Sequence, residues 1–232
     1  MSQAGTVAWL ALRELWMSFR LLVVLIAHVV AGAVVGLLPA FARDSVARLA
    51  IGLGLATLVT AAVAAWSMAD ERLTGRAGWL ITRTVPRGTY LAGWFVALAL
   101  VAIVGVIAAG VLGWLAIGSA APGGDRLALP AAMVGVAAST AAAAALGLLC
   151  GSLLRPRAAA AAAVAACGVV GALAWLAAAP EPWVPGAAHL LLARLVDADA
   201  VIPNALRAAG IGLALTSALL ITARAALDRS DL

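Results

Sequence analysis

The side chains with the greatest capacity for polar chemistry gather in one short stretch, residues 69–89, between two long apolar runs. Its charged residues are Asp70, Glu71, Arg72, Arg76, Arg83 and Arg87. Carboxylates and guanidinium groups form strong, charge-assisted hydrogen bonds. The stretch therefore offers charge to water or to a partner and predicts an interaction surface.

The backbone signals in this stretch favour a short helix on the membrane surface. Gly75 and Gly78 loosen the chain, and Pro86 precedes the next apolar run. Trp79 stands with Leu80 and Ile81 as an apolar patch among the charges. Such a pattern is typical of a brief amphipathic helix that lies in the interface. An ordinary loop that is basic because it faces the cytoplasm remains the alternative.

The composition places the whole chain in a membrane. Hydrophobic residues make up 66% of the 232 residues and charged residues 11%, whereas a soluble domain carries about 25% charge. We therefore expect an all-α integral membrane protein with a single transmembrane domain, 1–232. The two cysteines, Cys150 and Cys167, lie in apolar runs and predict neither a disulfide framework nor a metal site.

Six apolar runs approach or exceed the ~20 residues that a helix needs to cross a bilayer. The expected spans are residues 21–40, 49–68, 90–117, 127–154, 158–179 and 205–223. A preceding segment, residues 3–20, has an amphipathic helical pattern with tryptophans on its apolar face, which predicts an interfacial helix. Residues 180–204 are rich in proline and too short in their apolar core to span, so we expect short re-entrant helices there.

The arginines predict the orientation of these spans. With the N-terminus inside, ten arginines face the cytoplasm and five face outward, which is the positive-inside bias. Both termini and the 69–89 stretch are then cytoplasmic. All fifteen basic residues are arginine. A Walker A loop needs a lysine to reach the phosphates of ATP, so this chain is not expected to form one.

The order of residues in the charged stretch resembles a known family. Glu71-Arg72, Gly75, Leu80, Thr84, Pro86-Arg87, Tyr90-Leu91 and Gly93 follow the pattern after the second span in membrane subunits of type-2 ATP-binding-cassette (ABC) exporters. The chain lacks the acidic residue that often follows the glycine, and Trp94 replaces a common basic residue. The pair Arg13-Glu14 is similar to the charged pair of that family's N-terminal elbow helix, and the expected layout of spans is also similar.

The resemblance implies that the chain is not an enzyme by itself. It implies a complex with a pair of ABC ATPase subunits, which would hold ATP and Mg²⁺, and with a second membrane subunit in the plasma membrane. Coupling to the ATPase would involve Glu71, Arg72, Gly75, Arg76, Trp79, Pro86 and Arg87, and the elbow helix would use Arg13 and Glu14. Membrane lipid is an expected partner and nucleic acid is not.

Other functions remain alternatives. A secondary transporter would need ionisable groups near the middle of the membrane, and the expected spans hold almost none. A membrane enzyme would need clustered reactive side chains, and a scaffold protein needs no such signature. Apolar lining residues favour an apolar or amphipathic substrate such as a lipid, drug or peptide, but they do not name it.

Three smaller features predict packing. Gly32 and Gly36, and likewise Gly147 and Gly151, have the GxxxG spacing that lets two helices approach closely. The pattern leaves open whether these contacts lie within one chain or between subunits. His28 lies inside the first expected span without an acidic partner nearby in sequence, and we expect it to hydrogen bond a neighbouring helix.

Overall fold

The computed structural model describes residues 2–37, 42–77, 85–117, 128–176 and 201–229. All seven long elements in these ranges are α-helices: α1 (Gln3–Met17), α2 (Arg20–Leu37), α3 (Ala42–Leu73), α5 (Arg87–Ile117), α6 (Ala128–Leu153), α7 (Pro156–Leu176) and α9 (Val201–Arg229). The described ranges contain no strand. The predicted all-α class is thus confirmed for this part of the chain.

Several of these helices have the length and apolarity of membrane spans. Within the described residues, four stretches qualify: Ile51–Leu73, Arg87–Ala116, Leu129–Leu153 and Ala205–Arg229. Together, α1 and α2 would qualify as a fifth if the bent pair counted as one span, and α7 contributes a shorter apolar stretch. This is the architecture of a multi-pass membrane protein. The number six stays a prediction.

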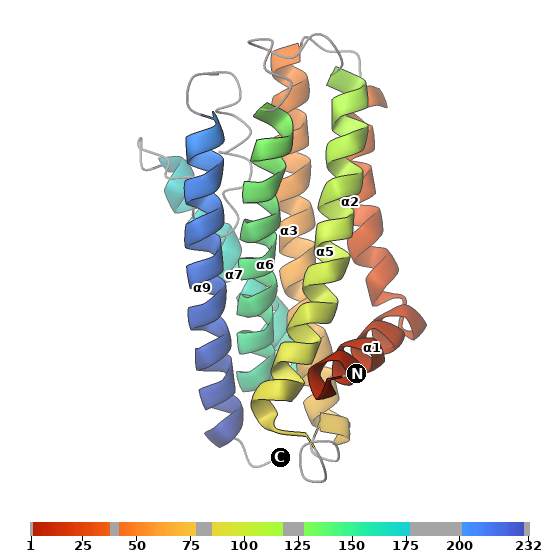
Figure 1. Ribbon diagram of the computed structural model, residues 1–232, viewed down its shortest axis with the longest axis vertical. Helices are drawn as coiled ribbons and strands as arrows, with labels where there is room; N and C mark the ends of the chain where they lie inside the picture. The colour runs from red at the N-terminus through yellow and green to blue at the C-terminus, as the bar shows by residue number, and fades with distance from the viewer. Residues whose placement is uncertain (1, 38–41, 78–84, 118–127, 177–200, 230–232) are drawn as a thin grey trace.

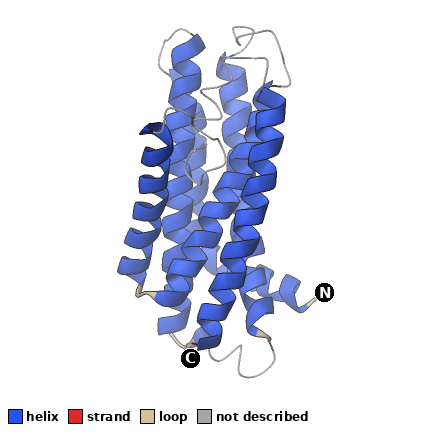
Figure 2. Cartoon of the chain, turned by 90° about the vertical axis from the view of Figure 1, so that its left-hand side faces the viewer, coloured by secondary structure: helices blue, strands red, loops and turns tan. Residues whose placement is uncertain are grey.

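The helices form an elongated bundle with one helix lying across its end. α2, α3, α5, α6 and α9 run side by side along the long axis, and α1 crosses the bundle near the end where α5 begins (Figures 1 and 2). α6 lies in the middle, because it packs against α9, α3, α5 and α7. The apolar cluster around α1 draws its side chains from α1, α3, α5, α6 and α9. α1 is therefore part of the packed protein.

A sharp break separates α1 from α2. The two helices are bent by 76°. At the break, the Ser18 hydroxyl donates to the Glu14 carbonyl oxygen at 2.7 Å, and Phe19 adopts a φ of 58°. A positive φ is uncommon for a residue with a bulky side chain, and one such residue suffices to stop the α1 helix. The segment expected at residues 3–20 is thus a separate helix that ends at Met17.

Small residues bring the helices of this one chain into direct backbone contact. A Cβ atom added at Gly151 would lie 2.7 Å from the Met68 Cβ, and one added at Gly147 would lie 2.8 Å from the Ala64 Cβ. A Cβ at Gly32 would lie 2.8 Å from the Ala109 Cα. The question left open by the sequence is therefore answered at these three glycines. They serve contacts within the chain, α6 on α3 and α2 on α5.

Several helices extend beyond the expected spans. α3 continues past Met68 to Leu73, so Asp70, Glu71 and Arg72 belong to a helix and not to a loop. α9 begins at Val201 and runs through the expected tail to Arg229. Both extensions occur where charged side chains find partners at the end of the bundle. The expected re-entrant helices lie mostly in 180–200, outside the described residues.

Prolines mark helix starts and do not interrupt the helices. Pro156 opens α7, and Pro130 and Pro203 lie in the first turns of α6 and α9. The first N–H groups of a helix have no partner within it, so a proline there costs no hydrogen bond. These three helices therefore begin at Ala128, Pro156 and Val201, close to the starts of the expected spans, whose bounds in the membrane stay predictions.

His28 does not bridge two helices as expected. Its Nδ1 lies 2.8 Å from the Val24 carbonyl oxygen of its own helix. The ring packs against Gly105 of α5, where an added Cβ would lie 2.8 Å from the His28 Cγ. His28 Nε2 is buried without a hydrogen-bond partner in the described chain. Inside the bundle, a polar contact between two helices is made by Thr57 and Thr140, whose hydroxyls lie 3.1 Å apart across α3 and α6.

Candidate functional site

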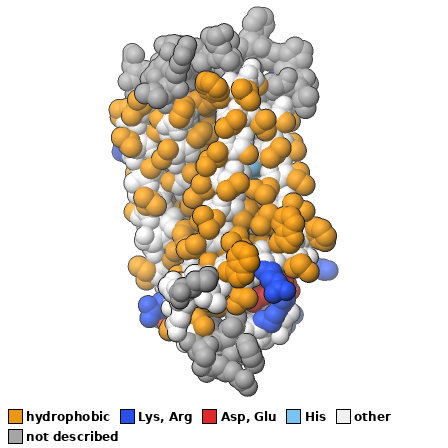
Figure 3. Space-filling view, turned by 45° about the vertical axis from the view of Figure 1, so that its right-hand side comes forward, with side chains coloured by type: hydrophobic (Ala, Val, Ile, Leu, Met, Phe, Trp, Pro, Cys, Tyr) orange, Lys and Arg blue, Asp and Glu red, His pale blue; other side chains and the backbone are white. Residues whose placement is uncertain are grey.

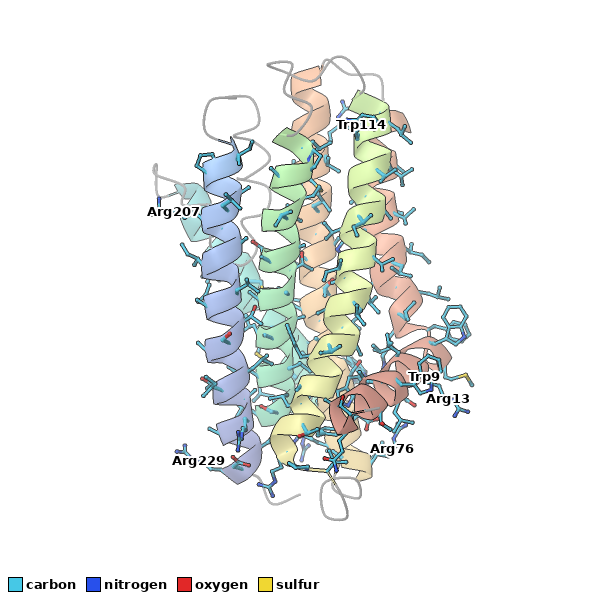
Figure 4. All side chains as sticks on the ribbon, in the orientation of Figure 1. Trp9, Arg13, Arg76, Trp114, Arg207 and Arg229 are labelled. Atoms are coloured by element: carbon cyan, nitrogen blue, oxygen red, sulfur yellow. The ribbon has the colours of Figure 1, made fainter. Side chains whose placement is uncertain are left out.

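The charged residues singled out in the sequence, as far as the structure describes them, lie at one end of the bundle. They come from α1, from the last turn of α3 and the residues after it, and from the start of α5. Figure 4 shows Arg76 beneath α1 at this end, with Arg13 and Trp9 pointing outward from α1. We call the group Glu14, Glu71, Arg76 and Tyr90 the charged cluster.

Arg76 is the centre of this cluster because it pairs with two carboxylates. Its Nη1 lies 3.0 Å from Glu14 Oε2, and its Nε lies 3.4 Å from Glu71 Oε1. Nε also donates to the Thr74 hydroxyl at 3.2 Å. Desolvation lowers the pKa of Arg76, but the attraction of Glu71 and Glu14 outweighs it and raises the pKa overall. The guanidinium thus stays charged and ties α1 to the end of α3.

Glu71 is the buried member of the cluster. Its side chain is 8% exposed, compared with 48% for Arg76 and 31% for Glu14. The Tyr90 hydroxyl donates to Glu71 Oε2 at 3.2 Å, and Tyr90 is itself fully buried. A buried carboxylate is stable only when it is paired and hydrogen bonded. Arg76 and Tyr90 supply these two partners, and the contact joins α3 to α5.

Other charges at the same end fasten further helices. Arg20 at the start of α2 pairs with Asp70 of α3 at 2.8 Å. Arg72 donates from Nη1 to the Gly151 carbonyl oxygen of α6 at 3.0 Å, while its buried Nε has no partner among the described residues. These contacts fix the end of α3 against both neighbours.

Arg87 fastens α5 to the end of α9. Its Nη1 donates to the Leu227 carbonyl oxygen at 2.8 Å and lies 3.7 Å from Asp228 Oδ1. A cation at the end of a helix also interacts favourably with the carbonyl dipoles there. Asp228 pairs in addition with Arg224 at 3.9 Å.

The structure brings together only some of the residues that the sequence grouped. Glu71, Arg76 and Glu14 meet directly, whereas Arg72 turns to α6 and Arg87 to α9. Arg13 makes no ion pair or hydrogen bond with another described residue. Gly75 has a φ of 72°, which suits glycine. Trp79 lies outside the described residues.

Pro86 and the residues around it begin α5. The Pro86 side chain is exposed, and its carbonyl oxygen accepts from the Tyr90 N–H at 3.0 Å, which closes the first turn of the helix. The sequence did not predict that Tyr90 is a hydrogen-bond partner of Glu71. It is the chain's one tyrosine and lies at the start of an apolar run, where a hydroxyl needs a polar partner.

An open groove lies beside the charged cluster. It has a volume of about 540 Å³ and is bounded by α1, the end of α3 and the start of α5. Its apolar walls include Leu10, Met17 and Trp94, and its charged lining comprises Arg13, Glu14, Glu71 and Arg76. The described residues contain no group of histidine, cysteine or acidic side chains that could hold a metal ion. The described charged side chains at this end make ion pairs and hydrogen bonds.

No protein-family model and no curated protein sequence matches the chain. The functional interpretation therefore depends on the residues and their geometry.

Proposed function

We propose that this chain is the membrane subunit of a type-2 ABC exporter. In this role it works with a separate ATPase to move an apolar or amphipathic substrate out of the cytoplasm. The charged cluster is the observation that carries the proposal. The short segment that follows α3 is attached through Arg76 to Glu14 of α1 and to Glu71 of α3. Glu71 in turn accepts a hydrogen bond from Tyr90 of α5.

This arrangement suits a segment that receives force from a partner. A displacement of residues 74–77 would act through Arg76 on Glu14 of α1 and on Glu71 of α3. At the other end of the segment, Arg87 holds the backbone of α9. An ATPase that moved the segment would therefore move four helices together. Rigid helices joined by polar contacts at their ends can transmit such a motion into the membrane.

The cluster leaves part of its surface open to a partner. Arg76 is 48% exposed while it holds its two carboxylates, and Pro86, just before α5, is also exposed. Arginine and tryptophan are the side chains that most often anchor a protein interface. Arg76 and Trp79 are the residues that we propose meet the ATPase, together with Gly75 and Pro86 as backbone determinants. Glu71, Arg72 and Arg87 then act by positioning this surface, since their partners lie within the chain.

The rest of the proposal follows from the sequence and from the helical architecture. A chain without lysine leaves ATP and Mg²⁺ to the ATPase pair. Two such membrane subunits, identical or different, would surround the transport path in the cell membrane. Both termini and the charged cluster would face the cytoplasm. The separate angled helix α1 supports the elbow role for Arg13 and Glu14.

Replacing Arg76 with alanine tests this role. We expect Arg76→Ala to weaken binding of the ATPase by at least about tenfold, because truncating an arginine anchor costs about 2 kcal/mol. Binding would be measured between the ATPase and the chain in lipid nanodiscs. Asp125→Ala, in the expected outer loop, is the control and should bind as the wild type does. Equal binding by all three proteins would contradict the proposed docking surface.

A further inference from the structure

The groove beside α1 is lined by apolar side chains and by charged side chains of both signs. Among its described lining residues, Arg13 and Arg76 balance Glu14 and Glu71, so the lining carries no net charge. Arg76 is committed to the two carboxylates, whereas Arg13 makes no ion pair or hydrogen bond within the described chain. Among the described lining residues, Arg13 is thus a cation without an ionic partner at the rim of the groove, and the partly exposed carboxylate of Glu14 follows it on α1.

The position of this rim is set by the apolar residues around Arg13. Trp9 and Met17 lie one helical turn before and after it on α1, and they are 63% and 68% exposed. Figure 3 shows apolar side chains covering the flank of the bundle, with arginine and acidic side chains close below them at this end. Exposed tryptophan next to arginine is typical of helices at headgroup depth. Arg13 thus lies at the boundary between the apolar flank and the polar end of the protein.

Arg13 and Glu14 place a positive and a negative side chain next to each other on α1, which suits a headgroup that carries both charges. They are consecutive on α1, so their side chains point about 100° apart around the helix. Arg13 points outward, as Figure 4 shows, and Glu14 points toward Arg76. A ligand whose anionic group lay on Arg13 would extend its next atoms into the groove toward Glu14. Those atoms should carry a hydrogen-bond donor and a positive charge.

We propose that this groove binds a zwitterionic phospholipid that carries a primary ammonium group, such as phosphatidylethanolamine. The phosphate contacts the guanidinium of Arg13, and the ammonium donates to the carboxylate of Glu14. The acyl chains leave along the exposed side chains of Trp9 and Met17. The lipid bound here is distinct from the substrate of the proposed exporter, and its binding does not require an ATPase.

The charge of the lining distinguishes this occupant from other lipids. An anionic lipid such as phosphatidylglycerol could also place its phosphate on Arg13, but its headgroup has no cationic group to donate to the carboxylate of Glu14. Phosphatidylcholine has the same net charge as phosphatidylethanolamine, but its quaternary ammonium cannot donate a hydrogen bond. Charge-assisted hydrogen bonds are about twice as strong as neutral ones, so the primary ammonium should decide the preference.

Native mass spectrometry of the purified full chain tests the proposal. The chain would be titrated with phosphatidylethanolamine, phosphatidylcholine and phosphatidylglycerol that carry identical acyl chains. We expect phosphatidylethanolamine to bind about fivefold more tightly than either other lipid, as one partly exposed charged pair allows. Equal affinity for the three lipids, or preference for phosphatidylglycerol, would overturn the proposal.

Two variants and a soluble competitor locate the site. Arg13→Gln should weaken the binding of phosphatidylethanolamine, because the phosphate loses its guanidinium contact, and should leave the melting temperature unchanged, since Arg13 has no partner within the described chain. Glu14→Gln should reduce the preference for phosphatidylethanolamine over phosphatidylcholine. Arg155→Gln, an exposed arginine between α6 and α7, is the matched control and should keep both affinity and preference. Wild-type affinity in Arg13→Gln, full preference in Glu14→Gln, or an equal loss of affinity in Arg155→Gln would place the lipid elsewhere and overturn the proposed site. Displacement of the lipid by equimolar phosphoethanolamine would show that the site recognises a free phosphate ester and would overturn the lipid assignment.

Discussion

Glu71→Ala is expected to destabilise the bundle by about 2 kcal/mol, because it leaves the buried Tyr90 hydroxyl without its acceptor and removes one of the two carboxylates on Arg76. Arg76 can turn to water, since it is half exposed, whereas Tyr90 cannot. The free energy of unfolding in mixed micelles measures the loss. Under the proposed function, the same variant should also uncouple ATP hydrolysis from transport.

Two further variants separate the contributions to this effect. Glu71→Gln keeps an oxygen that accepts from Tyr90, so it should lose clearly less stability than Glu71→Ala. Arg224→Ala removes an exposed ion pair with Asp228, which should contribute little, because exposed pairs are worth about 0–1 kcal/mol. A Glu71→Ala protein as stable as the wild type would mean that the cluster does not hold α3 and α5 together.

Gly147→Ala is the second substitution with a large expected effect. Its added methyl group would lie 2.8 Å from the Ala64 Cβ and 3.0 Å from the Ala65 backbone nitrogen. Neither atom belongs to a flexible side chain, so α3 and α6 must move apart. Overpacking of this kind costs about 1–3 kcal/mol. We expect a loss in that range, measured by the same unfolding experiment.

Gly210 of α9 provides the matched control. No atom lies within 4 Å of a Cβ added there, and alanine favours a helix over glycine by about 1 kcal/mol. Gly210→Ala should therefore be neutral or slightly stabilising. If Gly147→Ala and Gly210→Ala had equal effects, the close contact of α6 with α3 would not stabilise the fold.

Sequence reasoning predicted where the long helices lie because apolar runs and prolines mark them directly. It did not predict where α3 and α9 end. Charged residues such as Asp70 and Asp228 read as loop or tail, but each finds a partner at the end of the bundle and remains helical. The amphipathic pattern of residues 3–20 predicted a change of helix near residue 20, but it did not predict the positive φ of Phe19 at the break.

The role of the candidate site residues stays a prediction, and the contacts between them were not predicted from the sequence. Glu71 and Arg76 were expected to face a partner. The structure shows that Glu71 faces inward to Tyr90, nineteen positions along the chain. A contact of that separation depends on how two helices are placed, which local patterns do not reveal. GxxxG spacing had the same limitation, because it predicts a close approach but not the helix that makes it.

The proposal that an ATPase acts through this chain is tested most directly by ATP hydrolysis. The chain would be purified in nanodiscs, with and without the ABC ATPase that co-purifies with it from native membranes. We expect no hydrolysis by the chain alone, and hydrolysis coupled to substrate transport only when the ATPase is present. ATP hydrolysis by the chain without a second polypeptide would contradict the proposed function, and so would the failure of any ABC ATPase to co-purify.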